Sequence, residues 1–375
     1  MSLIYKEVKT GLIDMIASMK PHTRIPSRLS LCRKFMVART TVDKAIYELI
    51  HDGHLYAVNG SGTFVADFRT AEVSISQTVK NISILLPNIM DDTYPQILRG
   101  IEDVAQQKNI NVVVCNTDND LEKQRSYLRR LINSRIDGVI IVPAISQNQD
   151  NETYRLLQEA QVPFLFCNRN VEGVDGSCVC SNDFYGGFLA TRHLISQGYR
   201  HIEFLSTVTY KTSIDRYCGY LAALDSAGIP VESARMSLEG KWGGNGVTEV
   251  GGYHLMKRVL QTKPETDAIF CFNDRIAFGA AKALLEEGLK ISEDMGVIGY
   301  DNTDLCKTMP VGMTSVDYRN YEIGNCAAQT LYDMIGTQKP GPNQMILFEP
   351  RLVIRDSCRG PGRSCQITEG SVENV

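Results

Sequence analysis

One helical pattern of hydrophobic and polar positions stands out near the start of the chain, over residues 39–49, which read RTTVDKAIYEL. The hydrophobic residues there recur at the i, i+3, i+4, i+7 spacing of one helical face: Val42, Ala45, Ile46 and Leu49. The remaining faces are polar, and Arg39 lies in the first turn. The pattern predicts an amphipathic helix with one buried face, and it leaves open whether the polar face is only solvated or binds a partner.

The residues around this helix predict a small N-terminal domain. Hydrophobic residues spaced along 4–19 indicate a first helix that ends near Pro21, and Ser27 is a suitable N-cap for a second helix. The segment DGHLYAVNGSGTFVADF has turn residues between β-prone runs, which is typical of a β-hairpin. Helix, helix, tight turn, helix and hairpin make a winged helix-turn-helix, which we place at residues 1–67, with a polar linker at 68–80.

The rest of the chain alternates between hydrophobic strand-like runs and amphipathic helical stretches. The runs include NISILLP, NVVVCN, DGVIIVP, PFLFCN, HIEFLS, AIFCFN and MGVIGYD. Continuous hydrophobic strands separated by helices predict α/β architecture, with doubly wound parallel sheets covered on both faces. So many units exceed one open sheet, so we expect two lobes over residues 81–356. Residues 357–375 lack hydrophobic periodicity and are expected to form a mobile tail.

Composition adds a charge asymmetry to this picture. The chain has 375 residues, 43% hydrophobic and 22% charged, which is ordinary for globular domains. The overall net charge of −4 divides into about +4 for residues 1–70, with ten Lys and Arg against six Asp and Glu, and −8 for the remainder. A small basic head on an acidic body suggests that the head binds a polyanion.

The cysteines and the hydrophobic runs indicate in which cellular compartment the protein acts. The 11 cysteines lie mostly in strand-like runs rather than in a disulfide or zinc spacing, which indicates reduced thiols and a cytoplasmic protein. The N-terminus MSLIYKEVKTGLIDMI lacks the hydrophobic core of a signal peptide, and no run of 18 hydrophobic residues exists to span a membrane. We expect neither a metal nor another cofactor.

The segment IPSRLSLCRKFMVARTTVDKAIYELIHDGHL, followed by NGSGTFV, resembles the winged-helix domain of the GntR family of transcription regulators. The resemblance implies that the third helix is a recognition helix whose N-terminal end enters the major groove of double-stranded operator DNA. An arginine there can donate to guanine O6 and N7, and the glycine-rich wing can approach the minor groove. The DNA-binding residues expected from this resemblance are Arg28, Arg39, Thr40, Thr41, Lys44, Gly60, Ser61 and Gly62.

Asp43 departs from the GntR pattern, which usually has arginine at this position of the recognition helix. An aspartate there can accept a hydrogen bond from cytosine N4. It can equally form a salt bridge with Lys44 or Arg39. Both alternatives stay open, so the sequence does not reveal the operator.

Residues 81–356 resemble the LacI-type effector domain, which is similar to periplasmic sugar-binding proteins. The resemblance rests on segments such as DGVIIVP, HLISQGYRHIEFLS, FCFNDRIAFGAAKALLEEGLKISEDMGVIGYDN and TSVDYRNYEIG. A GntR-type head on such a body resembles the AraR group of regulators, whose members bind arabinose. This implies a sugar effector, with L-arabinose favoured, although the sequence alone does not identify the sugar.

A sugar needs polar partners for its hydroxyls and an aromatic ring for its C–H face. Such groups should lie where strands end and helices begin. Tyr94 and Trp242 suit stacking on that face, although a lone tryptophan is more often a core residue. Asp274 is expected to cap the following helix. For Asp183, capping a helix is an equal alternative to binding the ligand. The expected ligand-binding residues are Tyr94, Asn168, Arg169, Asp183, Arg216, Trp242, Asn273, Asp301 and Asp317.

Two other classes of function fit the sequence less well. Asp301 and Asp317 could suggest a glycosidase, but the alternation indicates a doubly wound fold, and catalytic signatures such as GxSxG, HExxH and the phosphate-binding loop are absent. A sugar-binding receptor domain of a transport or sensory system would lack the basic head. We therefore predict a sugar-responsive transcription regulator rather than an enzyme. A repressor is favoured, although the residues do not separate a repressor from an activator. A homodimer is expected, because one winged helix offers few contacts for an operator.

Overall fold

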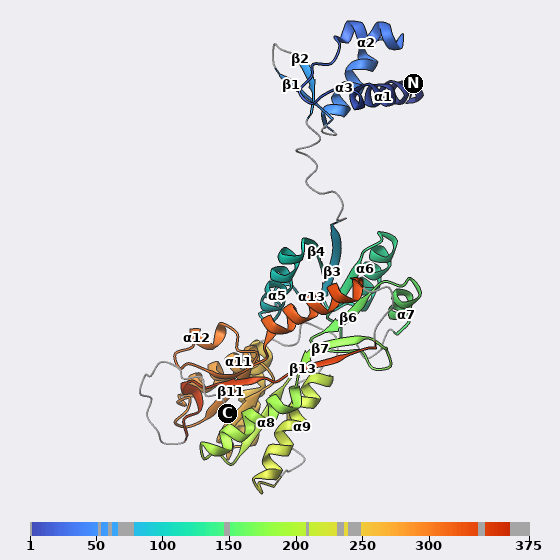
Figure 1. Cartoon of the computed structure of the whole chain (residues 1–375). Helices are drawn as coiled ribbons and strands as arrows, with labels where there is room; N and C mark the ends of the chain where they lie inside the picture. The colour runs from blue at the N-terminus through green and yellow to red at the C-terminus, as the bar shows by residue number, and fades with distance from the viewer. Residues whose placement is uncertain are drawn as a thin grey trace. The chain divides into compact units, whose positions relative to one another are not determined.

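The computed structural model describes residues 2–51, 54–58, 62–66, 79–145, 151–207, 210–230, 236–238, 249–336 and 342–360. The chain divides into two compact units, residues 1–78 and 79–375. Both are shown in Figure 1.

The first unit is a three-helix domain with a two-stranded antiparallel hairpin. Its elements are α1 (Ser2–Ala17), α2 (Arg28–Phe35), α3 (Arg39–His51), β1 (Leu55–Val58) and β2 (Gly62–Val65). The predicted hydrophobic face of α3 is confirmed, because its four residues are at most 1% exposed and pack with Leu12 and Leu31. Ser27 caps α2 as predicted, by accepting a hydrogen bond from the Ser30 amide at 3.2 Å.

The second unit has two lobes, each built on a six-stranded sheet. The first lobe contains β3 (Lys80–Leu86), α5 (Tyr94–Lys108), β4 (Ile110–Asn116), α6 (Leu121–Asn133), β5 (Gly138–Ile141), α7 (Asn151–Glu159), β6 (Phe164–Cys167), β7 (Ser177–Ser181), α13 (Asn320–Gly336) and β13 (Met345–Phe348). Its strand order is β13-β7-β6-β5-β3-β4, and every pair is parallel. Helices α5 and α13 pack on one face of the sheet and α6 and α7 on the other.

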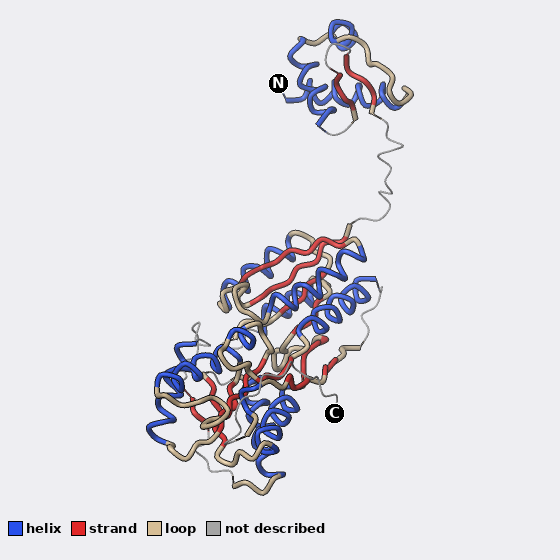
Figure 2. The backbone as a smooth tube through the Cα atoms, turned by 90° about the vertical axis from the view of Figure 1, so that its left-hand side faces the viewer, coloured by secondary structure: helices blue, strands red, loops and turns tan. Residues whose placement is uncertain are grey.

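The second lobe repeats this plan. It contains α8 (Asp183–Ser196), β8 (Ile202–Ser206), α9 (Lys211–Ser226), β9 (Met236–Leu238), α10 (Glu249–Thr262), β10 (Ala268–Cys271), α11 (Asp274–Glu286), β11 (Gly296–Tyr300), α12 (Leu305–Thr308), β12 (Thr314–Asp317), β14 (Arg351–Val353) and a 3₁₀ turn at Asp356–Cys358. The order is β14-β12-β11-β10-β8-β9, with only β14 antiparallel among the described strands. Figure 2 shows strands flanked by helices in both lobes, which confirms the predicted doubly wound architecture.

Among the described elements, the chain passes between the lobes three times. It leaves the first lobe after β7, returns after β12, and leaves again after β13 to form β14. Because all parallel strands end toward these passages, the loops that follow the strands of both lobes meet there. This is where the expected ligand-binding residues lie.

The predicted tail begins too early. Ser357 and Cys358 are 0% and 1% exposed, and the Ser357 hydroxyl donates to the Val297 carbonyl oxygen at 2.5 Å and accepts from the Thr314 amide at 2.9 Å. These residues belong to the second lobe, where Ser357 joins the start of β12 to β11. The signal was missed because a three-residue turn has no hydrophobic period.

Candidate functional site

The first candidate site is the exposed surface of α3. Arg39, Thr40 and Lys44 are exposed, and Thr41 is half-buried. Their backbone is fixed from below by the buried hydrophobic face of the same helix. The structure therefore presents the four predicted α3 residues on a supported helix, with Arg39 as its first residue.

Asp43 holds two of the predicted DNA-binding arginines. Arg28 Nε donates to Asp43 Oδ1 at 2.7 Å, and Arg39 Nε lies 3.5 Å from Asp43 Oδ2. Arg28 belongs to α2 and Arg39 to α3, so one carboxylate positions cations from both helices of the helix-turn-helix. Of the two alternatives for Asp43, the geometry agrees with the salt bridge to Arg39 and adds Arg28, which the sequence analysis had not paired with it.

Only part of the predicted wing, the hairpin of β1 and β2, lies within the described residues. Gly62 has a φ of 125°, and a Cβ at this position would overlap the Arg24 guanidinium, so no larger residue fits this backbone without displacement. Gly60 and Ser61 lie outside the described residues.

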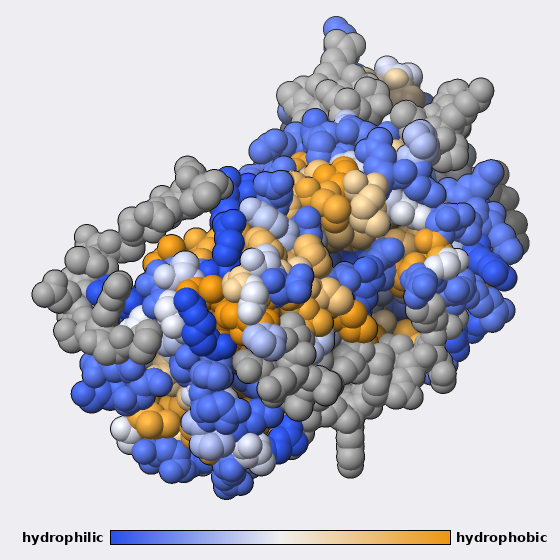
Figure 3. Space-filling view, turned by 90° about the horizontal axis from the view of Figure 1, so that it is seen from below, coloured by the Kyte–Doolittle hydropathy of each residue, from blue (hydrophilic) through white to orange (hydrophobic). Residues whose placement is uncertain are grey.

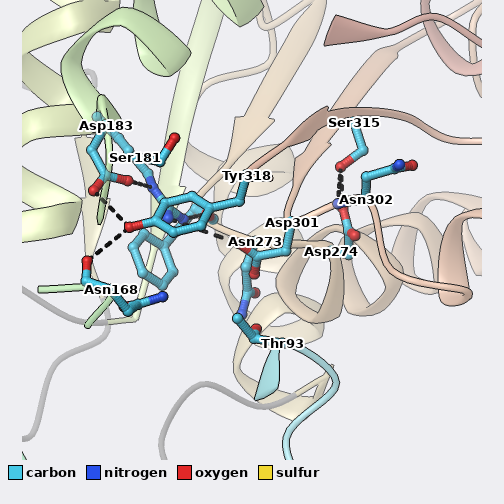
Figure 4. Close-up of polar contacts among 12 residues, drawn as sticks. Thr93, Asn168, Ser181, Asp183, Asn273, Asp274, Asp301, Asn302, Ser315 and Tyr318 are labelled. Atoms are coloured by element: carbon cyan, nitrogen blue, oxygen red, sulfur yellow. Dashed lines mark hydrogen bonds and ion pairs between the residues drawn. The ribbon is translucent and has the colours of Figure 1, made fainter. Parts of the chain in front are cut away.

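The second candidate site lies between the two lobes and is centred on Arg216. Figure 4 shows side chains from both lobes converging there. Arg216 is 4% exposed; its Nε donates to Asp183 Oδ1 at 2.7 Å and its Nη1 to the Phe272 carbonyl oxygen at 2.6 Å. Its Nη2 lies 3.8 Å from Asp301 Oδ1.

Aromatic rings enclose the same guanidinium. Its central carbon lies 3.5 Å from the Tyr300 ring centroid, 4.5 Å from that of Phe272 and 5.5 Å from that of Tyr318. Burial is the largest effect on Arg216 and lowers its pKa, but the surrounding Asp183, Tyr300, Asp301 and Tyr318 together outweigh burial and raise the pKa. Arg216 is therefore a buried and permanently charged hydrogen-bond donor of the site. The sequence analysis missed these aromatic residues, although each lies next to a predicted site residue or at a strand end.

Asp301 is the most perturbed carboxyl of the site. It follows β11 with a φ of 95°, and burial raises its pKa to about 8, opposed by Arg216. A backbone in this region is costly for a residue other than glycine, and such strain is concentrated at functional sites. Near neutral pH this group can therefore act as either a donor or an acceptor.

Asp183 and its neighbour Asn182 divide the two roles considered for Asp183, capping a helix and binding a ligand. The Asn182 side chain caps α8 by accepting from the Tyr185 amide at 3.0 Å. Asp183 is 6% exposed, pairs with Arg216 and lies 3.4 Å from the Tyr318 hydroxyl. Burial raises its pKa, and Arg216 opposes that effect. The capping alternative is thus wrong for Asp183, which faces the site.

The cap of α11 that was expected at Asp274 is supplied by Asn273. The Asn273 side-chain oxygen caps α11 by accepting from the Ile276 amide at 3.0 Å. Asp274 instead accepts from the Thr303 amide at 2.7 Å and from the Ser315 hydroxyl at 2.6 Å, and so joins the loop after β11 to β12. The prediction that Asp274 caps the helix is wrong. Asn273 keeps its side-chain NH₂ group for another partner.

The first lobe contributes Tyr94, Asn168 and Arg169. Asn168 has a φ of 69°, and its carbonyl oxygen accepts from the Tyr318 hydroxyl at 2.9 Å. Arg169 Nε donates to the Pro143 carbonyl oxygen at 2.9 Å, whereas its Nη2 is buried without a hydrogen-bond partner among the described residues. Tyr94 is 7% exposed, and burial raises its pKa. An orphaned guanidinium nitrogen beside a buried phenol is a ready partner for a polar ligand.

The structure brings the predicted ligand-binding residues together, with two exceptions. Asp317 Oδ1 accepts from the Arg319 amide at 2.9 Å at the end of β12, so this oxygen is already used within the loop. Trp242 lies outside the described residues.

The interlobe site is suited to binding a small polar molecule. Its polar groups are held by hydrogen bonds to one another and to backbone atoms. The aromatic rings around Arg216 help to leave its side chain only 4% exposed to solvent. Among the described residues, no group of three or more His, Cys, Asp or Glu is placed to hold a metal ion. None of the described helices combines the length and the hydrophobicity needed to cross a membrane.

Comparisons with known proteins agree with this geometry. Residues 79–349 match the model of periplasmic binding proteins and the sugar-binding domain of the LacI family, and residues 4–65 match that of bacterial regulatory proteins of the gntR family. The chain is 29% identical over 362 residues to the arabinose metabolism transcriptional repressor of Geobacillus stearothermophilus, covering 95% of this chain and 97% of that protein.

Other relatives match mainly the second unit. The HTH-type transcriptional repressor PurR of Actinobacillus pleuropneumoniae serotype 3 is 30% identical over 285 residues, which are 75% of this chain and 82% of that protein. A LacI family transcriptional regulator from Enterococcus faecium, solved with bound ribose, is 29% identical with a TM-score of 0.63, over 76% of this chain and 100% of that chain.

Proposed function

We propose that this chain is a transcription repressor whose operator binding is controlled by L-arabinose. The chain belongs to the family of periplasmic binding proteins and LacI-type sugar-binding domains, and it carries a GntR-type head. The observation that carries this proposal is the extent of the similarity to the arabinose repressor, which covers both units. The PurR relative, in contrast, covers three quarters of the chain.

The interlobe geometry supports a sugar as ligand. Arg216, Asp301 and Arg169 offer hydrogen-bonding groups, which a neutral polyol can satisfy with hydroxyls that both donate and accept. Tyr94 offers an aromatic ring at the start of α5 for the C–H face of the sugar, and Trp242 a second. Groups from both lobes meet around one ligand, so a bound sugar favours the closed form over the open one.

We further propose that the protein acts in the cytoplasm as a homodimer on a near-palindromic operator. Edge strand β4 exposes Val113 and Val114 by 44% and 42%, and α10 exposes Val250 by 62%. Exposed hydrophobic side chains along a sheet edge are surfaces that a partner commonly covers. A dimer would place two recognition helices on successive half-sites, and closure of the lobes would change their spacing.

A thermal-shift titration of the full chain with monosaccharides tests the proposed ligand. L-Arabinose at 100 times its dissociation constant should stabilise the effector domain by about 2.7 kcal/mol. Trp242 is the only tryptophan, so its fluorescence should change in the same titration if it stacks on the sugar. Stabilisation by another monosaccharide alone would identify a different effector, and no response to any of them would refute the sugar-binding site.

A further inference from the structure

A second cavity lies at the hinge, apart from the Arg216 site. It has a volume of about 470 Å³, within the ~300–1,000 Å³ range of small-molecule pockets. Its walls are one face of α8, with Tyr185, Leu189 and His193 among its residues, and the segment that runs from Glu349 into β14. We call this cavity the hinge pocket.

All three passages between the lobes border the hinge pocket. Helix α8 begins directly after β7, Arg319 lies between β12 and α13, and Glu349 and Pro350 lie between β13 and β14. Arg319 has a φ of 68° and follows Tyr318, which contacts Asn168 and Asp183 in the interlobe site. A molecule in this pocket therefore touches the segments that must rotate when the lobes open or close.

The polar groups of the pocket are suited to an anion. Arg192 and Arg351 are exposed at its wall and form no ion pair within the described part of the chain, whereas Arg319 donates to Glu322 at 2.7 Å. His193 Nε2 is buried and has no hydrogen-bond partner among the described residues. Burial lowers the His193 pKa to about 4, so the imidazole is neutral at pH 7 and can donate without adding charge. Glu349 is the carboxylate among the lining residues.

The number and kind of donors favour a phosphate group. Two guanidinium groups and one imidazole nitrogen provide three separate donors, and a phosphate ester presents three strong acceptor oxygens where a carboxylate presents two. Both walls also contribute hydrophobic side chains, Leu189 from α8 and Leu352 and Ile354 from the segment after Glu349, which can cover a carbon skeleton.

We propose that the hinge pocket is a second effector site, which binds a small phosphorylated metabolite through Arg192, Arg351 and His193 and changes the affinity of the interlobe site. The coupling part of this proposal rests on the proposed function, whereas binding in the pocket does not. Because the pocket borders the hinge, a ligand there binds the two lobe arrangements unequally and shifts their populations.

Isothermal titration calorimetry of the full chain at constant ionic strength tests the binding. The probes are glycerol 3-phosphate, glucose 6-phosphate and inorganic phosphate, with glycerol and glucose as uncharged controls. We expect one phosphate-ester site per chain, and weaker binding of inorganic phosphate because it leaves the hydrophobic wall uncovered. Equal affinities for inorganic phosphate and both esters would overturn the metabolite as ligand, and no binding of any phosphate compound would overturn the site.

Two substitutions locate the binding. Arg192→Gln and Arg351→Gln should each weaken the ester by roughly tenfold or more, since each removes a charge-assisted hydrogen bond. Arg129→Gln, an exposed arginine on α6, is the matched control and should bind as the wild type. Matching thermal midpoints would show that the variants fold. Undiminished binding in the Arg192→Gln/Arg351→Gln double variant would place the phosphate elsewhere and overturn the proposal.

The coupling is measured by repeating the monosaccharide titration with the ester at saturation. We expect the midpoint for the sugar to shift in the wild type and to stay unchanged in the double variant. An ester that binds but leaves the midpoint unchanged would overturn the coupling alone. Because the calorimetry with glycerol 3-phosphate uses neither DNA nor a monosaccharide, its outcome is independent of the proposed function.

Discussion

At the residue scale, the recognition helix depends on how its first residue is held. Arg39 is the start of α3, its side chain is 77% exposed, and Asp43 lies one turn away. The carboxylate limits the positions that the guanidinium can reach, and the exposed side chain stays accessible to the operator DNA of the proposed function. This arrangement explains why an acidic residue is compatible with a DNA-binding helix.

Arg39→Ala should weaken operator binding by about 1–3 kcal/mol, because it removes a phosphate contact or a bidentate contact to guanine. Fluorescence anisotropy with labelled operator measures the change. Arg129→Ala in α6 serves as the control, since it removes another exposed arginine from the other unit. If the two variants bind equally well, Arg39 does not contact the operator.

The carboxyl groups around Arg216 predict a dependence of stability on pH. The pKa of Asp301 is about 8 in the folded protein against an ordinary value of 3.8, so the folded form retains a proton that the unfolded chain has released. The free energy of unfolding should therefore fall as pH rises from about 4 to 8, by about 1.4 kcal/mol per pH unit for each such proton. Asp183 and Asp274, whose pKa values are also raised by burial, add to this slope.

Asp301→Asn should reduce that slope without abolishing it. Denaturant unfolding at several pH values, followed by the fluorescence of Trp242, reports on the effector domain because this is the only tryptophan. Asp304→Asn is a suitable control, since its side chain is 93% exposed. A wild-type slope in the Asp301 variant would show that this carboxyl titrates normally.

At the element scale, helix pairs of the effector domain pack through reciprocal glycines. A Cβ on Gly187 of α8 would overlap the carbonyl oxygen of Arg216 in α9, and one on Gly219 of α9 would overlap that of Phe184. The same close approach joins α10 to α11 and α5 to α13. The α8–α9 contact matters for function, because it sets the depth at which Arg216 enters the interlobe site.

Gly187→Ala should destabilise the effector domain by about 1–3 kcal/mol, since the added methyl group forces two helix backbones apart. It should also weaken sugar binding, because the displaced backbone carries Arg216. Thermal unfolding and the sugar titration give the two readouts. Gly336→Ala, at an open position at the end of α13, should leave both unchanged. Wild-type stability of the Gly187 variant would mean that the helices can separate without cost.

How far the sequence predicts this fold also depends on the element. Amphipathic helices such as α3 and hydrophobic strands such as β3 carry their own pattern, and the structure has them where the pattern predicts. Strands β9 and β14 have three residues each, too short for a period, and their pairing is set by the rest of the sheet. The helix cap at Asn273 instead of Asp274 has a similar origin. Both residues follow β10, and only the three-dimensional course of the loop after β11 decides which one meets Thr303.

At the scale of the whole molecule, a basic DNA-binding unit is joined to an effector domain with a large interlobe surface. Figure 3 shows a face on which hydrophobic residues gather toward the middle, with hydrophilic residues around them. Surfaces of this kind are often covered in oligomers or by ligands. In the proposed dimer, the effector domains would fix the separation of the two heads, and ligands at the interlobe site and the hinge pocket would alter it.

The central claim is that one chain couples sugar binding to operator binding. The most direct measurement is capture of genomic DNA fragments by the purified full-length protein, with and without saturating L-arabinose, followed by sequencing. We expect enriched fragments that share an inverted repeat and that are lost when the sugar is present. Recovery no greater than with the Arg39→Ala variant, or recovery that no monosaccharide alters, would contradict the account.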